Sequence, residues 1–217
     1  MALKIRSTSE IGARGIKCVV YGASGTGKTV LCSTAPQPFI ISAEQGLLSL
    51  ARKDIPFAEV ATIADIGEAY KYAKSNDSIE TICLDSLSEL AAVCLTQFKK
   101  EVSDGRQAYG KLAEAFGALI RNFRDIDDKN VVFVAKQRRV EDEELGLSYH
   151  EPYLPGRVLP FDLPYLVDEV LCLRIARNGD RYLQTAAERK YIAKDRSGKL
   201  DAAEPADLSA IFNKIRS

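Results

Sequence analysis

The feature that most constrains this chain is the segment 22–29, which reads G-A-S-G-T-G-K-T. It follows an apolar stretch, residues 16–21, that predicts a strand, and it leads into residues 28–35, which predict a helix. The glycines let the backbone curl so that successive N–H groups point at one anion, and the start of the helix adds its positive end. This order of elements predicts a phosphate-binding loop, with a chance glycine-rich turn as the alternative.

The loop and a later aspartate together predict a site for ATP and Mg²⁺. We expect Lys28 to reach the β- and γ-phosphates and to act in catalysis, and we expect the Thr29 hydroxyl to bind Mg²⁺. The apolar run Thr81–Leu84 ends in Asp85, and such an acid beside a phosphate loop holds Mg²⁺ through water. A plain helix N-cap is the alternative reading of Asp85. The residues expected to touch the nucleotide are Gly22, Ala23, Ser24, Gly25, Thr26, Gly27, Lys28, Thr29 and Val30.

Composition limits the class of protein. The chain has 217 residues and a formal net charge of +0, which excludes a broad basic field for non-specific binding of nucleic acid. No apolar run reaches the roughly 18 residues that a membrane span needs, and residues 1–15 are too polar for a signal peptide. We therefore expect a cytoplasmic protein with no membrane partner. The single histidine, His150, argues against a histidine-rich metal site. Five cysteines without a C-x-x-C pair are expected to be small buried hydrophobes: Cys18, Cys32, Cys83, Cys94 and Cys172.

Alternating apolar and amphipathic stretches predict an α/β fold with a mostly parallel central sheet flanked by helices. Two apolar runs around Asn178-Gly179 predict a C-terminal antiparallel hairpin. Residues 138–164, rich in charge, proline and aromatic side chains, are expected to form a long loop that is functional or mobile. Further strands are expected at 38–42, 57–63, 79–84 and 130–135, and helices at 65–74, where Asp65 is the cap, 86–100, 109–123 and 205–215.

The neighbours of Asp85 exclude several classes of NTPase. Ser86 follows it, so the Asp-Glu pair of many AAA-type ATPases is absent. The Asp-x-x-Gly and Asn-Lys-x-Asp motifs of GTPases and the Leu-Ser-Gly-Gly-Gln signature of transporters are absent as well. The acid that polarises water must then come from elsewhere. Glu44, just past the strand at 38–42, is the candidate because ligands meet the carboxyl ends of such strands. An ordinary surface acid is the alternative.

Taken together, residues 22–29, 39–44 and 82–86 resemble, in that order, the core of the RecA recombinases. The short length and the C-terminal third are similar to phage-encoded RecA-like single-strand-annealing recombinases. The resemblance implies a RecA-like ATPase domain over residues 16–217 and an N-terminal segment, residues 1–15, that contacts a neighbouring subunit. No counterpart of RecA's N-terminal polymerisation helix or C-terminal domain is expected.

The resemblance implies roles for four further side chains. Glu44 matches the glutamate that orients the attacking water. Gln137 matches a glutamine that senses the γ-phosphate, although Lys136 stands where RecA has asparagine. Lys194 and Arg196 match a Lys-x-Arg-x-Gly element whose cations act on the nucleotide of the neighbouring subunit. The implied assembly is a homo-oligomer, ring or filament, with the nucleotide at the subunit interface. A solvated strand end and a solvated basic turn are the alternative readings.

Single-stranded DNA is the partner that the resemblance implies, with annealing and homologous recombination in a phage as the activity and a single-stranded-DNA-binding protein as a candidate partner. Residues 101–111 and 138–157 match two loops that face the axis of such an assembly. Rings interleaved with cations suit single strands, whereas the acidic residues 141–144 would repel phosphate. The candidate DNA-binding residues are Arg106, Tyr109, Lys111, Arg138, Arg139, Tyr153 and Arg157.

Two other functions fit parts of the sequence. The neutral net charge and the acidic residues 141–144 favour an ATPase of this type that acts on a protein partner, such as a helicase loader or a regulatory ATPase. A small-molecule kinase could use residues 138–157 as a lid, but it would leave Glu44, Lys194 and Arg196 without a role.

Overall fold

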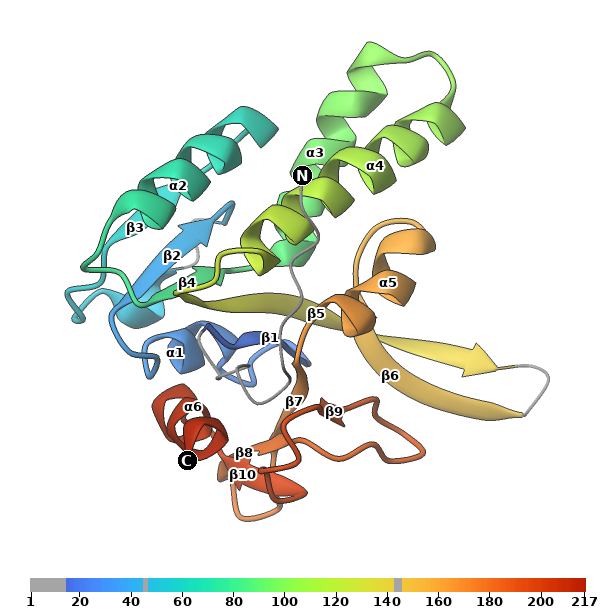
Figure 1. Ribbon diagram of the computed structural model, residues 1–217. Coiled ribbons are helices and arrows are strands. Elements are labelled where there is room, and N and C mark those ends of the chain that lie inside the picture. Colours follow the sequence, from blue (N-terminus) through green and yellow to red (C-terminus); the bar gives the residue numbers. More distant parts are fainter. Residues whose placement is uncertain (1–14, 45–46, 143–145) are drawn as a thin grey trace, which may run out of the picture.

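A central sheet with helices on both faces forms the body of the molecule (Figure 1). The computed structural model describes residues 15–44, 47–142 and 146–217. Six neighbouring strands, from β3 to β7 in the order below, are parallel. In spatial order the strands are β3 (Phe57–Glu59), β2 (Pro38–Ser42), β4 (Thr81–Leu84), β5 (Asn130–Asp142), β1 (Lys17–Gly22), β7 (Glu169–Ile175), β8 (Arg181–Gln184) and β10 (Ala203–Pro205). Two further strands pair off this path, β6 (Leu147–Tyr153) with β5 and β9 (Lys194–Asp195) with β7.

Successive side chains of the central strands pack into two separate hydrophobic cores, because side chains alternate between the faces of a sheet. In β1, Val19 and Tyr21 join one core, whereas Cys18 and Val20 join the other. The first core is covered by α2 (Ile63–Ser75), α3 (Leu87–Glu101), α4 (Gly105–Arg124) and α5 (Val158–Leu166). The second is covered by α1 (Lys28–Cys32), η2 (Leu47–Leu50) and α6 (Leu208–Arg216).

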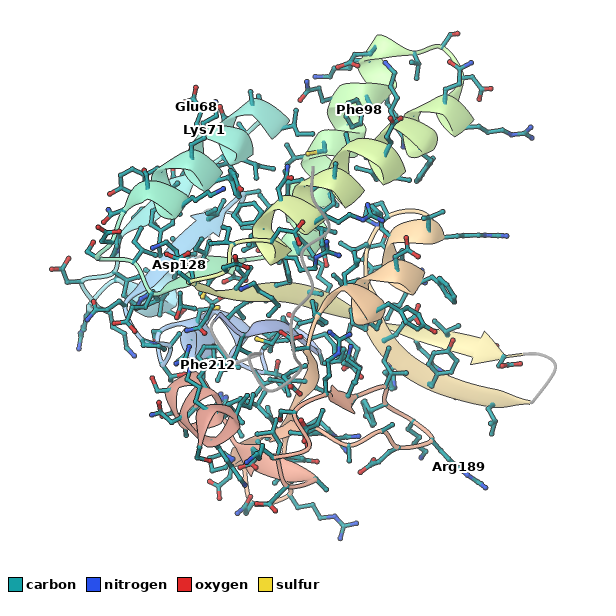
Figure 2. The ribbon with its side chains drawn as sticks, viewed as in Figure 1. Glu68, Lys71, Phe98, Asp128, Arg189 and Phe212 are labelled. Carbon is teal, nitrogen blue, oxygen red and sulfur yellow. The ribbon has the colours of Figure 1, made fainter. Side chains whose placement is uncertain are left out.

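Side chains on the helices follow this layering. Phe212 of α6 is fully buried against the sheet, whereas Glu68 and Lys71 of α2 point into solvent (Figure 2). The five cysteines are buried and free, as expected. Among the described residues, no helix has the length and apolar character needed to cross a bilayer.

The predicted α/β class, the parallel sheet and the C-terminal hairpin are confirmed. The hairpin is β7 with β8, and Gly179 takes a positive φ of 91° in its turn. The predicted strand at 57–63 ends early, at Glu59, because Thr62 is the N-cap of α2. Asp65 is therefore not the cap; it is the third residue of a capping box and accepts hydrogen bonds from the N–H groups of Ala61 and Thr62.

The largest correction concerns residues 138–164, which are not a long loop. Strand β5 continues past the core to Asp142, and β6 returns beside it, from the Asp142–Leu147 pair to the Lys136–Tyr153 pair. Nearly all side chains of residues 136–142 and 147–153 are half-buried or exposed, so the arm tolerates the charges that suggested a loop. The arm leads through a short turn into α5, where Pro160 falls in the first turn and costs no helical hydrogen bond.

Helix boundaries also differ from the prediction. Helix α4 begins at Gly105 rather than at 109, because the Asp104 carboxylate caps it by accepting from Arg106 N at 2.8 Å. Helix α1 ends at Cys32, three residues before the expected end. Helix α6 begins at Leu208 rather than at 205, because residues 203–205 are used as strand β10.

Candidate functional site

The phosphate loop has the backbone that its glycines predict. It leaves β1 at Gly22 and enters α1 at Lys28. Gly25 and Gly27 have φ values of 80° and 96°, in the left-handed region that favours glycine. Gly22 is needed for a different reason, because a Cβ there would lie 2.6 Å from the backbone oxygen of Leu173 in β7. The loop is therefore packed closely against the neighbouring strand.

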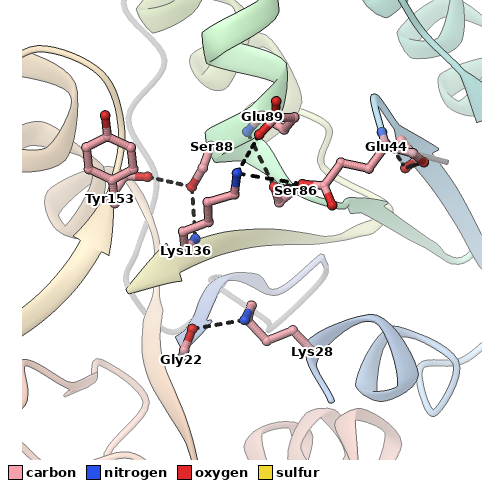
Figure 3. Close-up of polar contacts among 9 residues, drawn as sticks. Gly22, Lys28, Glu44, Ser86, Ser88, Glu89, Lys136 and Tyr153 are labelled. Atoms are coloured by element: carbon pink, nitrogen blue, oxygen red, sulfur yellow. Dashed lines mark hydrogen bonds and ion pairs between the residues drawn. The ribbon is translucent and has the colours of Figure 1, made fainter. Parts of the chain in front are cut away.

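Lys28 turns back over the loop that precedes it. Its Nζ donates to the carbonyl oxygens of Gly22 and Ala23, both at 2.9 Å (Figure 3 draws the first of these bonds). Burial lowers the pKa of Lys28, and the negative charges of Asp85 and Glu44 oppose that shift. The ammonium group is thus held in the loop by two weak neutral acceptors, which phosphate oxygens can replace.

Asp85 lies beside Thr29 of the phosphate loop. It follows β4, which β5 separates from β1, and the Asp85–Ser86 peptide is cis. Burial raises its pKa, and a hydrogen bond with the Thr29 side chain lowers it. Within the described residues its carboxylate has no ion-pair partner. A buried carboxylate beside a threonine hydroxyl and a phosphate loop fits Mg²⁺. The N-cap of α3 is Ser86, which excludes the alternative reading of Asp85.

Glu44 is held close to Asp85 and Ser86. Its backbone closes a small turn with Ser42, whose hydroxyl accepts from Glu44 N at 3.2 Å and donates to Glu44 O at 2.8 Å. Its Oε1 accepts a hydrogen bond from Ser86 Oγ at 3.2 Å and lies 3.9 Å from Lys136 Nζ (Figure 3). Glu44 and Lys28 both act on the charge of Asp85. The structure thus brings together Glu44, Asp85 and Lys28 at the carboxyl edge of the sheet.

Two further cations at this edge had no role in the sequence prediction. Lys136, beside Gly22 in the sheet, pairs with Glu89 at 2.5 Å, and this hydrogen bond raises the pKa of Lys136. Arg181 of β8 donates from Nε to the backbone oxygen of Thr26 at 2.8 Å. The sequence did offer a reason to expect Lys136 at this site, because Lys136 directly precedes Gln137, which was already a candidate residue. No signal in the sequence pointed to Arg181, which lies 155 residues from the loop.

Gln137 already has a partner for its amide. Its Nε2 lies 3.0 Å from Nδ1 of His150 on the facing strand, and the His150 ring stacks on Tyr191 at 4.9 Å. The side chain is half-buried at the base of the arm, one residue beyond the Gly22–Lys136 pair. Gln137 is therefore near the phosphate loop, with its side chain bonded to the arm.

Lys194 and Arg196 are bonded to the C-terminal end of α5. Lys194 Nζ donates to the carbonyl oxygens of Pro164 at 2.5 Å and Val167 at 2.6 Å. Arg196 pairs with Asp168 at 3.0 Å and donates to the carbonyl oxygen of Tyr165 at 3.3 Å. Burial, followed by the charge of Arg196, lowers the pKa of Lys194. Such cations favour a helix C-terminus, where the carbonyl groups point outward.

These two cations lie at the far end of β1 from the phosphate loop of their own chain. Strand β9 pairs with Glu169 and Val170, at the beginning of β7. Those residues pair in turn with Cys18 and Val19, whereas the loop begins at Gly22, about 10 Å further along the strand. The site formed by the loop, Asp85 and Glu44 is therefore built without them.

The two predicted DNA-binding segments meet in the structure. Tyr109 lies in the second turn of α4 and not in a loop, and a Cβ on Gly156 would lie 3.5 Å from its ring. Lys99 lies over the Tyr109 ring at 5.5 Å, and Arg138 lies over the Tyr153 ring at 5.8 Å. Arg106 and Arg157 are exposed.

Three of the candidate DNA-binding cations are paired with acids. The pairs are Arg138 with Glu151 at 2.5 Å, Lys111 with Glu101 at 3.1 Å and Arg139 with Glu141 at 3.4 Å. Part of the acidic run, Glu143 and Glu144, and residues 1–14 of the expected subunit contact lie outside the described residues.

Comparison with known proteins places the chain in a family. A family model described as an AAA domain matches residues 14–197, which is most of the chain. No curated protein matches the sequence. The match corrects one inference from the sequence: Ser86 in place of a glutamate after Asp85 does not separate this chain from the AAA-type ATPases.

Proposed function

Because the chain belongs to this AAA-domain family of P-loop ATPases, we propose that it hydrolyses ATP at residues 22–29, with Glu44 as the acid that orients the attacking water. The observation that supports this proposal is the convergence of Lys28, Asp85 and Glu44 at one edge of the sheet. Only Glu44 of the three is an exposed carboxylate that can reach a water molecule.

Each side chain has one task in this reaction. Lys28 gives up its bonds to the loop carbonyls and binds the β- and γ-phosphates. Thr29 and Asp85 would hold Mg²⁺, which supplies positive charge against the phosphate oxygens. Glu44 accepts a hydrogen bond from a water that attacks the γ-phosphorus. The bond from this phosphorus to the bridging oxygen breaks, ADP keeps the bonding electrons, and the proton of the water leaves through Glu44.

The cations that complete the site come from a neighbouring copy. Lys194 and Arg196 lie at the far end of β1 from their own loop, which supports a role for them in trans. Cations of this kind stabilise the charge that develops on the transferred phosphoryl group. Hydrolysis then depends on assembly, and a single chain in solution is a weak ATPase.

The test of Glu44 compares binding with turnover. Glu44→Gln keeps the size of the side chain but cannot accept a proton, so we expect ATP affinity to persist while the hydrolysis rate falls about 10²- to 10⁴-fold. Lys28→Ala is expected to lose ATP binding itself. Glu59→Gln, an exposed acid in β3, is the matched control and should behave as wild type. If Glu44→Gln hydrolyses ATP at the wild-type rate, the proposed role of Glu44 is wrong, while the assignment of residues 22–29 to ATP binding is unaffected.

The macromolecular substrate that we propose is single-stranded DNA, which the protein anneals during recombination in a phage. Supporting this, Tyr109 and Tyr153 expose rings beside cations where α4 meets the base of the arm. Bases stack on such rings, and phosphates meet the cations. A single-stranded-DNA-binding protein is a further proposed partner.

Annealing of two complementary labelled strands tests this part of the proposal. Tyr109→Ala and Tyr153→Ala are expected to weaken binding of single strands, by about 1–3 kcal/mol for each stacked base. Tyr72→Ala, which removes an exposed ring from α2, should leave binding unchanged. Absence of DNA binding with ATP, with ADP and without nucleotide would refute the proposal.

One observation favours the alternative of a protein partner. Arg138, Lys111 and Arg139 are already paired with acids of their own chain, which reduces the positive charge offered to phosphate. An ATPase that loads a helicase or regulates another protein would bind its partner through this surface, which carries both cations and acids. Recovery of a replication protein by the immobilised ATPase, in a way that DNA does not displace, would support this alternative.

A further inference from the structure

Lys136 is a cation at the phosphate loop that the proposed reaction does not use. It lies in β5 opposite Gly22, the first residue of the loop. Its backbone is fixed, because Lys136 N donates to Ser88 Oγ at 2.9 Å and Ser88 Oγ donates to the carbonyl oxygen of Tyr153 at 2.6 Å (Figure 3). Its side chain is 50% exposed. The side chain can therefore change its partner without a movement of the strand.

Two carboxylates face the ammonium group of Lys136. Its Nζ lies 2.5 Å from Oε2 of Glu89, in the first turn of α3, and 3.9 Å from Oε1 of Glu44. The Glu89 side chain is 33% exposed, and ion pairs this close to solvent contribute little to stability. A more highly charged anion can therefore replace Glu89 as the partner of Lys136.

Two lysines converge where the proposed reaction places the γ-phosphate. Burial lowers the pKa of Lys28, and the positive charge of Lys136 adds to this shift, so the two ammonium groups repel each other. An anion between them relieves that repulsion. A water that contacts both Glu44 and the γ-phosphorus puts the phosphate about 6 Å from the Glu44 carboxylate. Lys136 Nζ, 3.9 Å from the same carboxylate, reaches the phosphate by rotation of its side chain.

We propose that Lys136 exchanges Glu89 for the γ-phosphate when ATP binds, and that this exchange distinguishes ATP from ADP. The inference rests on the proposed function, because it places ATP at residues 22–29. A terminal phosphate carries about two negative charges, against one on Glu89, and is the stronger partner. ADP lacks this group, so with ADP Lys136 keeps its ion pair with Glu89. Glu89 is thus a competitor of the γ-phosphate for one cation.

Glu89 does not need a new cation after the exchange. It lies at the N-terminal end of α3, where the helix dipole stabilises a negative charge. Its backbone N–H donates to Ser86 Oγ at 3.3 Å, and Ser86 Oγ donates to Glu44 Oε1 at 3.2 Å. The acid that Lys136 leaves is therefore connected through Ser86 to the acid that orients the attacking water in the proposed reaction.

The experiment measures the Kd of ADP and of a non-hydrolysable ATP analogue, each with Mg²⁺, by competition with a fluorescent nucleotide. We expect the wild type to prefer the analogue. Lys136→Met should reduce this preference about 10- to 100-fold with an unchanged Kd for ADP, because one hydrogen bond between charged groups is lost. Lys136→Arg, which keeps the charge, should retain most of the preference.

The competitor gives an effect in the opposite direction. Glu89→Gln frees Lys136 and should tighten binding of the analogue several-fold without changing the Kd for ADP. In the double variant with Lys136→Met, the substitution Glu89→Gln should give no gain. The controls are Lys71→Met, at an exposed lysine of α2, and Glu101→Gln, which removes the acid of an exposed ion pair at the other end of α3. Both controls should bind the two nucleotides as wild type does.

Three outcomes overturn the inference: an unchanged preference in Lys136→Met, an equal loss of affinity for ADP and the analogue in that variant, or no tighter binding of the analogue by Glu89→Gln. Thermal unfolding of each variant verifies that it is folded. The binding assay involves no hydrolysis, which separates this inference from the proposed function. If the wild type hydrolyses ATP and Lys136→Met keeps the preference, only the exchange is wrong. If the variants behave as expected and the wild type does not hydrolyse ATP, only the proposed hydrolysis is wrong.

Discussion

Glu169 gives a quantitative prediction that links pH to stability. Its side chain is fully buried at the start of β7, and Oε2 has no hydrogen-bond partner among the described residues. Burial, together with the charge of Asp195, raises its pKa from 4.5 to about 7. The folded state therefore favours the protonated carboxyl, and ionising Glu169 requires more free energy in the folded state than in the unfolded chain.

The sign and the size of the effect follow from this shift. Well below pH 4.5 the carboxyl is protonated in both states, and Glu169 contributes no penalty. As the pH rises toward 7 the unfolded chain ionises first, so the protein loses stability through this window. A shift from 4.5 to about 7, at 1.36 kcal/mol for each pKa unit, amounts to about 3 kcal/mol above pH 7. Glu169→Gln cannot ionise and lacks this loss.

The assay is urea unfolding of wild type and Glu169→Gln at several pH values between 5 and 8.5. Because other groups titrate alike in both proteins, the difference between the two unfolding free energies isolates Glu169. We expect it to move by about 2.5 kcal/mol in favour of Glu169→Gln across this window, because the unfolded carboxyl is already partly ionised at pH 5. Glu68→Gln, at an exposed acid of α2, should give a difference that does not change with pH. A pH-independent difference for Glu169→Gln would refute the reasoning.

Two further pairs of variants test packing and the nucleotide site. Gly22→Ala places a methyl group against a backbone oxygen of β7 and should lower the free energy of unfolding in urea by about 1–3 kcal/mol. Gly67→Ala, in open space on α2, should raise it by about 0.5–1 kcal/mol. Equal effects of the two substitutions would contradict the close packing of the loop. Arg181→Ala removes the hydrogen bond to Thr26 and should raise the KM for ATP several-fold in a steady-state ATPase assay. Arg177→Ala, in the turn of the same hairpin, should leave this KM unchanged. Equal KM values for the two variants would show that Arg181 does not position the loop.

The part of the fold that could be predicted depends on local sequence. The phosphate loop was predictable because a short run of residues specifies its backbone, and the parallel sheet because buried strands are apolar runs. The arm was missed because residues 136–142 of β5 and most of β6 are polar, so no apolar period marks them. Pairing across the hairpin, as between Arg138 and Glu151, and contacts with distant residues such as Tyr191 stabilise the arm, and neither produces a periodic pattern in the sequence.

Contacts between distant residues limited the prediction of the site. Asp85 and Glu44 were found because strand ends of a parallel sheet gather at one edge. The contact of Arg181 with the loop joins residues that share no motif. The bonds of Lys194 and Arg196 to α5 could not be foreseen either, since the sequence predicted no helix over residues 158–166.

Strand β5 runs without a break from the edge of the sheet that carries the phosphate loop to the end of the arm. It lies beside the phosphate loop at Lys136 and runs on to Asp142, about 20 Å further. Under the proposed function, this strand runs from beside the bound phosphates to the end of the arm. A tilt of about 10° at Lys136 moves Asp142 by about 3 Å, the thickness of a stacked base, over this length of strand. Under the proposed function, a small movement of β5 beside the nucleotide would therefore be larger at the end of the arm, where a partner would be bound.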